Sequence, residues 1–159
     1  MSGSAKQQAE DEEVFILWIP VRIKSPSSQA ELSTSAYTNS GFRAGEPTVI
    51  IPAALARALG LDISHARASE DYVACGGARP RVLELGEIHI RLDITDREVP
   101  WMTARAICVE DEDEVLISRE LMARMRIIPD YEARTWRLKD DPPDVSRGEA
   151  EPRYWTEVR

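Results

Sequence analysis

Two cysteines and two histidines are the side chains best suited to metal binding or nucleophilic chemistry: Cys75, Cys108, His65 and His89. Protein zinc sites need three or four ligands at short, regular spacings. These residues lack such spacing, so the sequence predicts no metal site and no cofactor. A Cys/His nucleophilic pair would require two of them to meet in space. The simplest interpretation is two free thiols in a reducing compartment, since nothing but their number suggests a disulfide.

Five consecutive acids, Glu110 to Glu114, are the second group with chemical potential. Such a run is typical of a solvated loop. A divalent cation or a basic partner is the functional alternative, but the run lacks the spaced glycine and alternating ligands of a calcium loop.

The overall charge restricts the possible partners. The chain has 159 residues, 43% of them hydrophobic, and a net charge of -8, so one globular domain is expected. The acidic balance argues against broad nucleic-acid binding, which needs a surplus of Lys and Arg. The apolar run Val14 to Val21 is too short to span a bilayer, and the amino terminus has no signal-peptide layout. We therefore expect a cytoplasmic protein that binds neither nucleic acid nor membrane.

Composition divides the chain into three parts. Residues 1–13 are polar and charged and predict a disordered tail, and residues 14–139 predict the folded domain. Residues 140–159 are rich in Pro, Asp, Glu and Arg and predict a polar C-terminal tail, in which Tyr154 and Trp155 could dock on a surface.

Within the folded part, short apolar and alternating runs predict β-strands. The predicted strands are Val14–Ile23, Leu32–Thr38, Thr48–Ile51, Arg81–Leu85, Ile88–Leu92, Trp101–Val109 and Thr135–Leu138. His89 lies between Ile88 and Ile90, so we expect it to face outward. Two short helices are predicted at Pro52–Leu59 and Arg119–Arg126, the first with a proline in its first turn and Gly60 as its stop.

These helices belong to an internal repeat. Residues 49–61 align without a gap with residues 115–127. Each segment has a three-residue apolar strand, a residue suited to a helix start, and a helix with apolar positions in matching places. Any buried strand followed by an amphipathic helix has this pattern, but two such units predict a β-rich domain with internal pseudo-symmetry.

Together with their order and spacing, the motifs around this repeat resemble those of retropepsin-like aspartic proteases. That family has an apolar strand leading into Asp-Thr/Ser-Gly, then a strand, a proline and a helix ending in Leu-Gly-Leu. A later strand runs into Gly-Arg-x-Leu. The corresponding segments here are Ala36–Phe42 with Asn39-Ser40-Gly41 at its centre, Ile51–Leu61, and Val115–Leu121 with Ser118 and Arg119. The resemblance covers roughly residues 14–138.

The resemblance implies a fold and a mechanism. The fold is an all-β, retropepsin-like closed β-barrel with two short helices and a flap hairpin, for which Cys75-Gly76-Gly77-Ala78 is the candidate. The same glycines also fit an ordinary surface turn. In that family a homodimer brings together one catalytic Asp from each chain, and the two share one proton. One carboxylate then activates water against an extended peptide held beneath the flaps.

The sequence departs from this family at three places. Asn39 stands where the catalytic Asp is expected, Ser118 stands where the family has Gly, and Arg43–Glu46 looks like an insertion. A carboxamide keeps the shape of a carboxylate but carries no charge, so a dimer would hold no general base. Two accounts fit Asn39, a natural pseudo-protease or an engineered Asp-to-Asn change, and the second departure at Ser118 favours the natural one.

Other interpretations remain open. Carboxylates that could on paper replace the missing one are Asp62, Glu70, Asp71 and Asp93, although none lies in a Ser/Thr-Gly turn. The segment Thr48–Pro52, followed by a helix and Leu59-Gly60-Leu61, also resembles the core of DNA-binding regulators of the AbrB/MazE kind. A non-catalytic dimerisation or scaffold module, or a small barrel used only for assembly, is the remaining alternative.

Overall fold

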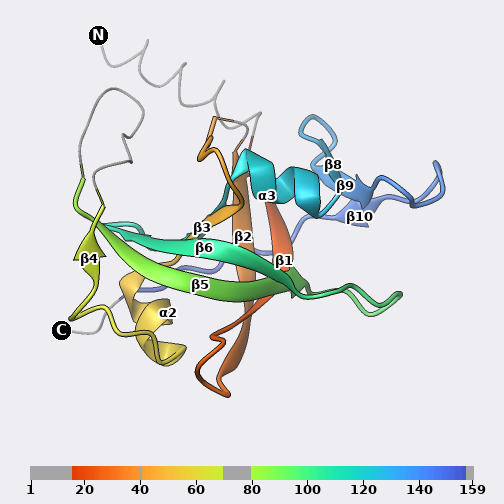
Figure 1. The fold of residues 1–159 in the computed structure, drawn as a ribbon. Helices are drawn as coiled ribbons and strands as arrows, with labels where there is room; N and C mark the ends of the chain where they lie inside the picture. Colours follow the sequence, from red (N-terminus) through yellow and green to blue (C-terminus); the bar gives the residue numbers. More distant parts are fainter. Residues whose placement is uncertain (1–15, 40, 70–79, 157–159) are drawn as a thin grey trace, which may run out of the picture.

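The computed structural model describes residues 16–39, 41–69 and 80–156 (Figure 1). Seven strands form the main sheet: β1 (Ile16–Lys24), β2 (Glu31–Asn39), β3 (Thr48–Ile50), β4 (Arg67–Ala68), β5 (Val82–Leu92), β6 (Met102–Val109) and β7 (Val115–Ile117). The other elements are α2 (Ala53–Ala58), α3 (Arg119–Arg124), β8 (Ile127–Asp130), β9 (Thr135–Leu138) and β10 (Arg147–Gly148).

Six of these strands close into a barrel. They follow the order β1-β2-β7-β3-β6-β5, and β5 pairs back onto β1 with Ile23 opposite Ile90. The two-residue strand β4 extends the sheet from β5. The predicted all-β closed barrel and its two short helices are therefore confirmed. The second helix is shorter than expected, because Arg126 adopts a left-handed backbone with φ 60°.

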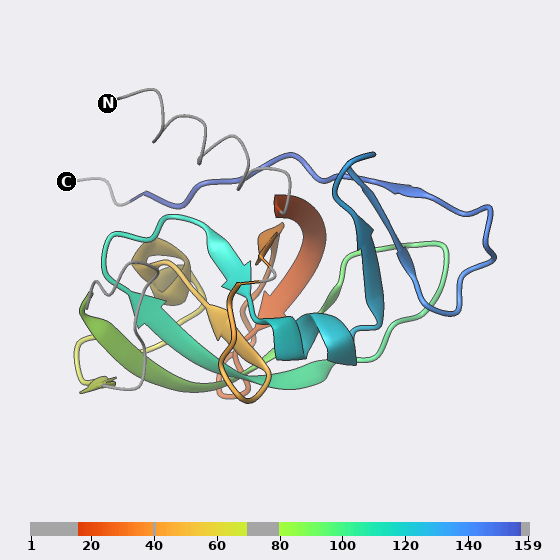
Figure 2. The ribbon, with the colours of Figure 1, turned by 90° about the horizontal axis from the view of Figure 1, so that it is seen from above.

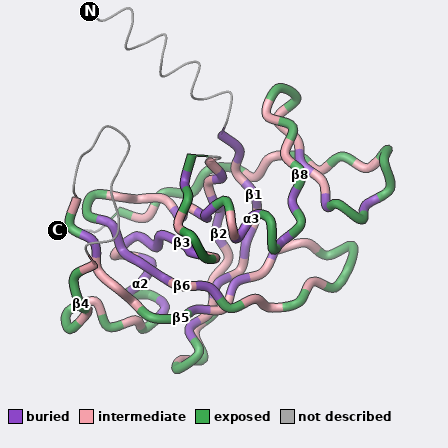
Figure 3. Tube along the Cα trace, turned by 45° about the horizontal axis from the view of Figure 1, so that its top comes forward, coloured by how far each residue is buried: buried purple, intermediate pink, exposed green. Residues whose placement is uncertain are grey.

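Alternating apolar residues fill the barrel. In β1 the side chains of Leu17, Ile19, Val21 and Ile23 are fully buried, while the residues between them are only partly buried. Figure 3 shows this buried trace along the central strands, with exposed loops at the periphery. Burial of each such side chain stabilises the fold by about 1.5–3 kcal/mol. His89 lies between the buried Ile88 and Ile90 and faces outward, which confirms that prediction.

Two strands were predicted where the structure has one. The sequence predicts separate strands on either side of Gly86, but β5 runs continuously from Val82 to Leu92. Its register against β6 shifts between Glu84 and Gly86, and Gly86 has φ 86°. A glycine inside a strand marks either a break or a bulge, and here it is a bulge.

The internal repeat is confirmed and contains a local two-fold axis. β3 and β7 are antiparallel neighbours, and Ile50 lies directly opposite Leu116, its equivalent in the alignment. On the outer sides, β2 runs parallel to β7 and β6 runs parallel to β3. The strands β2-β7-β3-β6 therefore form a symmetric group whose axis passes between Ile50 and Leu116.

The two helices repeat one hydrogen-bond pattern. In α2 the N–H groups of Ala56, Leu59 and Gly60 donate to the carbonyls of Pro52, Leu55 and Arg57. In α3 the equivalent donors are Met122, Met125 and Arg126, bonded to Ser118, Leu121 and Ala123. Gly60 and Arg126 both have positive φ, so each helix ends with the same left-handed residue.

The described part of the C-terminal segment, residues 140–156, lies against the barrel. After β10 pairs with β9, the chain runs back past β1, as Figure 2 shows, and Ala150 N–H donates to the carbonyl of Trp18. Trp155 is partly buried against the main core, whereas Tyr154 is 56% exposed. The domain boundary at residue 139 stays a prediction, but this polar segment packs as part of the same body.

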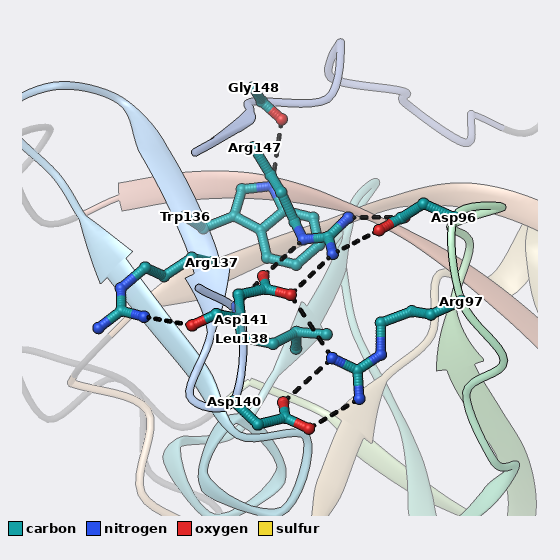
Figure 4. Close-up of polar contacts among 9 residues, drawn as sticks. All are labelled: Asp96, Arg97, Trp136, Arg137, Leu138, Asp140, Asp141, Arg147 and Gly148. Atoms are coloured by element: carbon teal, nitrogen blue, oxygen red, sulfur yellow. Dashed lines mark hydrogen bonds and ion pairs between the residues drawn. The ribbon is translucent and has the colours of Figure 1, made fainter. Parts of the chain in front are cut away.

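A network of ion pairs anchors the start of that segment (Figure 4). The carboxylate of Asp141, with its side chain 4% exposed, accepts hydrogen bonds from Arg147 Nε at 3.0 Å and Leu138 N–H at 2.8 Å. Arg147 also binds Asp96 through two bonds of 2.8 Å, and Arg97 holds Asp140 through bonds of 2.8 and 3.1 Å. The network joins the loop after β5 to residues 138–147.

Candidate functional site

The turn after β2 contains the residue that stands at the catalytic position in the family resemblance. Asn39 is half-buried and is the last residue of β2. Its side-chain oxygen accepts a hydrogen bond from Gly41 N–H at 2.8 Å, and its carbonyl accepts one from Phe42 N–H at 3.1 Å. A Cβ at Gly41 would lie 3.2 Å from that side-chain oxygen, so a glycine fits the turn best.

The start of α3 holds the other side of this turn. Arg119 N–H donates to the carbonyl of Phe42 at 2.8 Å. The carboxylate of Glu120 accepts from the N–H groups of Ala44 and Gly45, both at 3.0 Å. Burial acts to raise the pKa of Glu120, but these N–H groups prevail and hold the pKa below its usual value. The insertion-like segment Arg43–Glu46 is thus fixed to α3, a role for Glu120 that the sequence analysis missed.

Ser118 has a structural role in the same region. Its side chain is fully buried and its oxygen accepts from Leu121 N–H at 3.1 Å, which caps α3. The same oxygen accepts from Thr48 N–H at 3.0 Å, while Ser118 N–H donates to the carbonyl of Thr48. Ser118 therefore links α3 to β3 by two hydrogen bonds that a glycine's backbone could make only in part. The repeat predicted a residue suited to a helix start at this position, but not this link.

The structure brings together the predicted residues Asn39, Gly41, Ser118 and Arg119. Parallel pairing of Thr38 with Ile117 sets the ends of β2 and β7 side by side. Ser40 and the flap candidates Cys75, Gly76, Gly77 and Ala78 lie outside the described residues. Chemically, the described turn offers a neutral carboxamide and backbone N–H groups, and no proton acceptor in the neutral pH range.

Two candidate replacement carboxylates are tied to partners of their own. Asp62 accepts from Ser64 and lies 2.8 Å from His65 Nδ1, on an exposed loop after α2. The carboxylate of Asp93 forms an ion pair with Arg22, whose Nε lies 3.5 Å away. The backbone N–H of Asp93 donates to the carbonyl of Pro20, which lies four residues along β1 from Ile16, the residue that pairs with Asn39. At about 3.3 Å per strand residue, that is roughly 13 Å from the turn. Glu70 and Asp71 lie outside the described residues.

The internal two-fold axis gives Asn39 an apolar counterpart. The pairing of β2 with β7 and of β6 with β3 makes Tyr37 equivalent to Ile107, and hence Asn39 equivalent to Val109. Each turn is closed by an equivalent hydrogen bond: Phe42 N–H donates to Asn39 O, and Glu112 N–H donates to Val109 O, both at 3.1 Å. Val109 is 4% exposed. The described chain therefore has the Asn39 turn once. At the pseudo-symmetric position, the acidic run follows Val109.

The acidic run is less solvated than the sequence predicts. Glu112, Asp113 and Glu114 are each partly buried. Burial and then the neighbouring charges of Asp113 and Glu114 raise the pKa of Glu112. Burial also raises the pKa of Glu114, which accepts a hydrogen bond from Trp18 Nε1 at 2.6 Å. Cys108, just before this run, is a free buried thiol whose pKa burial raises.

Within residues 16–39, 41–69 and 80–156, no three His, Cys, Asp or Glu side chains are grouped so that they could hold a metal ion. Over the same residues, no helix is long and apolar enough to cross a membrane.

Comparison with known proteins gives one structural likeness. No protein-family model matches the chain, and no curated protein matches it. Among solved structures, the retroviral protease-like domain of Ddi1 from Leishmania major is similar, with a TM-score of 0.49 and 15% identity. The superposition covers 86% of this chain and 94% of that domain. A likeness at this level assigns no activity, and the barrel is defined by its own strand pairing.

Proposed function

We propose that the chain is a retropepsin-like domain that binds extended peptides as a homodimer and is catalytically impaired by Asn39. The observation that carries the proposal is the turn at Asn39, closed by the 2.8 Å bond from Gly41 N–H. An aspartate in the same place could accept this bond with one oxygen and keep the other for a shared proton.

The internal symmetry supports the dimer. Because Val109 is the pseudo-symmetric equivalent of Asn39, the described chain has one polar turn, which would be one half of the proposed symmetric site. A second chain, related by a two-fold axis near Asn39, would supply the other half, and such two-fold dimers are the commonest homo-oligomers. An extended peptide would then lie across the dimer and bond to it through its backbone.

The proposed impairment follows from proton chemistry. Two asparagines cannot share a proton or activate water, and loss of general acid–base catalysis alone slows a reaction by about 10²–10⁴. We therefore expect peptide binding without cleavage in the chain as it stands.

Asn39→Asp tests the proposal. We expect this variant to dimerise and to cut a peptide library at acidic pH, with fragments detected by mass spectrometry, while Asn39→Ala and the unchanged chain cut nothing. Sedimentation velocity would measure the dimer for all three proteins. A folded, dimeric Asn39→Asp variant that cuts no peptide between pH 3 and pH 7 would refute the claim that Asn39 is what impairs a protease site. A protein that stays monomeric at all concentrations would refute the site formed by two chains.

The AbrB/MazE alternative has less support. It rested on Thr48–Pro52, but β3 is paired on both edges within the chain, with β7 on one side and β6 on the other. That strand is therefore not free for exchange with a second chain. The scaffold alternative differs from the proposal only in that the dimer would bind no peptide. Peptide binding can be measured with the same three proteins.

A further inference from the structure

A cleft of about 780 Å³ lies beside α2, away from the Asn39 turn. We call it the α2 cleft. Its walls come from α2, the loop after it, the start of β5, the end of β6 with the acidic run, and the end of the C-terminal segment. Neither Asn39, Gly41 nor Phe42 lines it. Its volume is within the range of small-ligand and side-chain pockets.

Apolar surface forms much of the cleft. Ala53 and Ala54 present one face of α2, and Leu61 and Ile63 follow from the next loop. Trp155 closes the cleft from the C-terminal segment. Burial of apolar side chains of a ligand against these groups would favour binding.

The position of Trp155 is fixed by bonds at both ends of the residue. Its backbone N–H donates to the carbonyl of Asp113 at 2.6 Å, and its indole N–H donates to Thr34 Oγ1 at 2.9 Å. Arg153 lies over the ring with its guanidinium 4.2 Å from the ring centroid. An aromatic wall is thus attached directly to the acidic run, and one of its faces already attracts a cation.

The charges of the cleft are unbalanced. Five carboxylates line it, against two guanidinium groups, Arg57 and Arg81. The five are Asp62, Glu110, Asp111, Glu112 and Asp113. Among the described residues Asp62 pairs with His65, but the other four carboxylates, all from the acidic run, form no ion pair. Glu112 is the most crowded, and its raised pKa reflects burial and nearby like charge.

We propose that the α2 cleft binds a peptide segment in which an arginine or lysine stands beside apolar residues. The cationic group would lie against Glu112 and Asp113 and near the Trp155 ring, and the apolar side chains would pack on Ala53, Ala54 and Leu61. A bound cation would relieve the repulsion within the run. A divalent metal fits less well, because no described group of three ligands exists here.

The probe is an acetylated and amidated pentapeptide of alternating leucine and arginine, titrated into the ¹⁵N-labelled full chain. We expect saturable chemical-shift changes at α2 and at residues 110–113. A second peptide, with citrulline in place of arginine, has the same shape without charge and should bind much more weakly. Shift changes at Asn39 and Gly41 would instead report binding at the proposed dimer site, so the location of the changes distinguishes the two sites.

A matched pair of double variants tests the location. Glu112→Gln with Asp113→Asn removes two charges from the cleft, and Glu98→Gln with Asp144→Asn removes two exposed charges elsewhere. Both change the net charge equally. We expect the first to weaken binding roughly tenfold and the second less than about twofold, since each close ion pair contributes up to about fivefold.

The outcomes separate clearly. Equal weakening by both double variants would mean attraction to the acidic chain as a whole, which overturns the proposal. Equal binding of the citrulline peptide, shift changes confined to other surfaces, or no saturable binding at low salt would also overturn it. Thermal melting of the variants would verify that they fold, and we expect Glu112→Gln to be no less stable than the parent.

Discussion

Ser118 and Thr48 hold each other by two hydrogen bonds, one from Thr48 N–H to the serine oxygen at 3.0 Å and one from Ser118 N–H to the threonine carbonyl at 2.9 Å. Thr48 begins β3 and Ser118 precedes α3, so this pair joins the two halves of the repeat. Both residues are fully buried. The serine that looked like a departure from the protease pattern is therefore a stabilising feature of this barrel.

Replacement of this serine should be costly. Ser118→Ala leaves the buried N–H groups of Thr48 and Leu121 without their acceptor, so we expect a loss of about 2–3 kcal/mol in the free energy of unfolding. Urea denaturation followed by circular dichroism measures it. The exposed Ser146 provides a control, and Ser146→Ala should change stability by less than about 0.5 kcal/mol. Equal effects at the two sites would contradict the role assigned to Ser118.

The contact between Gly41 and Asn39 can be tested by a double-mutant cycle. Gly41→Ala places a Cβ 3.2 Å from the Asn39 side-chain oxygen and should destabilise the chain by about 1 kcal/mol. In an Asn39→Ala background the oxygen is absent, so the same change should cost nothing or slightly stabilise the fold. The free energy of unfolding of the four proteins gives the coupling. Additive effects would mean that the turn is not closed by this side chain.

The buried carboxylate of Asp141 should make stability depend on acid pH. Hydrogen bonding by Arg147 lowers the pKa of Asp141 to about 2, against an ordinary 3.8. The stabilisation is therefore complete above the ordinary value and is lost as pH falls through about 2. Asp141→Asn should cost roughly 2 kcal/mol at pH 7, and less and less from pH 4 downward. Denaturation at several pH values measures the difference.

Asp140 is the control for that experiment. It is adjacent in the chain and bound to Arg97, but its side chain is 48% exposed. Asp140→Asn should cost less than about 1 kcal/mol, as expected for an exposed pair. If the two substitutions cost the same, the burial of Asp141 has no energetic effect.

The crowded Glu112 should have the opposite pH dependence. Its pKa is raised above 4.5, so the charged form is disfavoured in the folded chain and the penalty grows as pH rises through the folded pKa. Glu112→Gln should raise the Tm at pH 7 by roughly 1–3 °C, and this gain should disappear below about pH 4.5. Differential scanning calorimetry at pH 4 and pH 7 measures both values. A lower Tm at pH 7 would mean that the carboxylate has an unrecognised partner.

Local patterns were sufficient for the elements but not for their assembly. Three kinds of element were predicted: the strand at Ile88–Leu92 from its alternation, α2 from its proline and glycine, and the two strand–helix units from the repeat. Each pattern depends on neighbours within a few residues. The bulge at Gly86 was missed, since a glycine in a strand is compatible with a break or a bulge until its partner strand is known.

The C-terminal segment shows what sequence patterns cannot supply. Residues 140–156 have the composition of a tail, and only the docking of Tyr154 and Trp155 was anticipated; Trp155 docks, whereas Tyr154 stays exposed. Arg147 is held by Asp96, 51 positions earlier, and Trp155 by Thr34, 121 positions earlier. Such partners depend on the closed barrel, which composition does not reveal. The α2 cleft was missed for the same reason, because its walls come from four separate stretches of the chain.

The place of β7 between β2 and β3 has a consequence for synthesis of the chain. β2 and β3 follow each other closely, yet neither can complete its pairing until β7, far downstream, has left the ribosome. A nascent chain that ends at β6 would carry unpaired edges on both strands, which are prone to aggregate. Distant pairings also form slowly. We therefore expect the barrel to close only after β7 has emerged, with shorter nascent chains depending on chaperones.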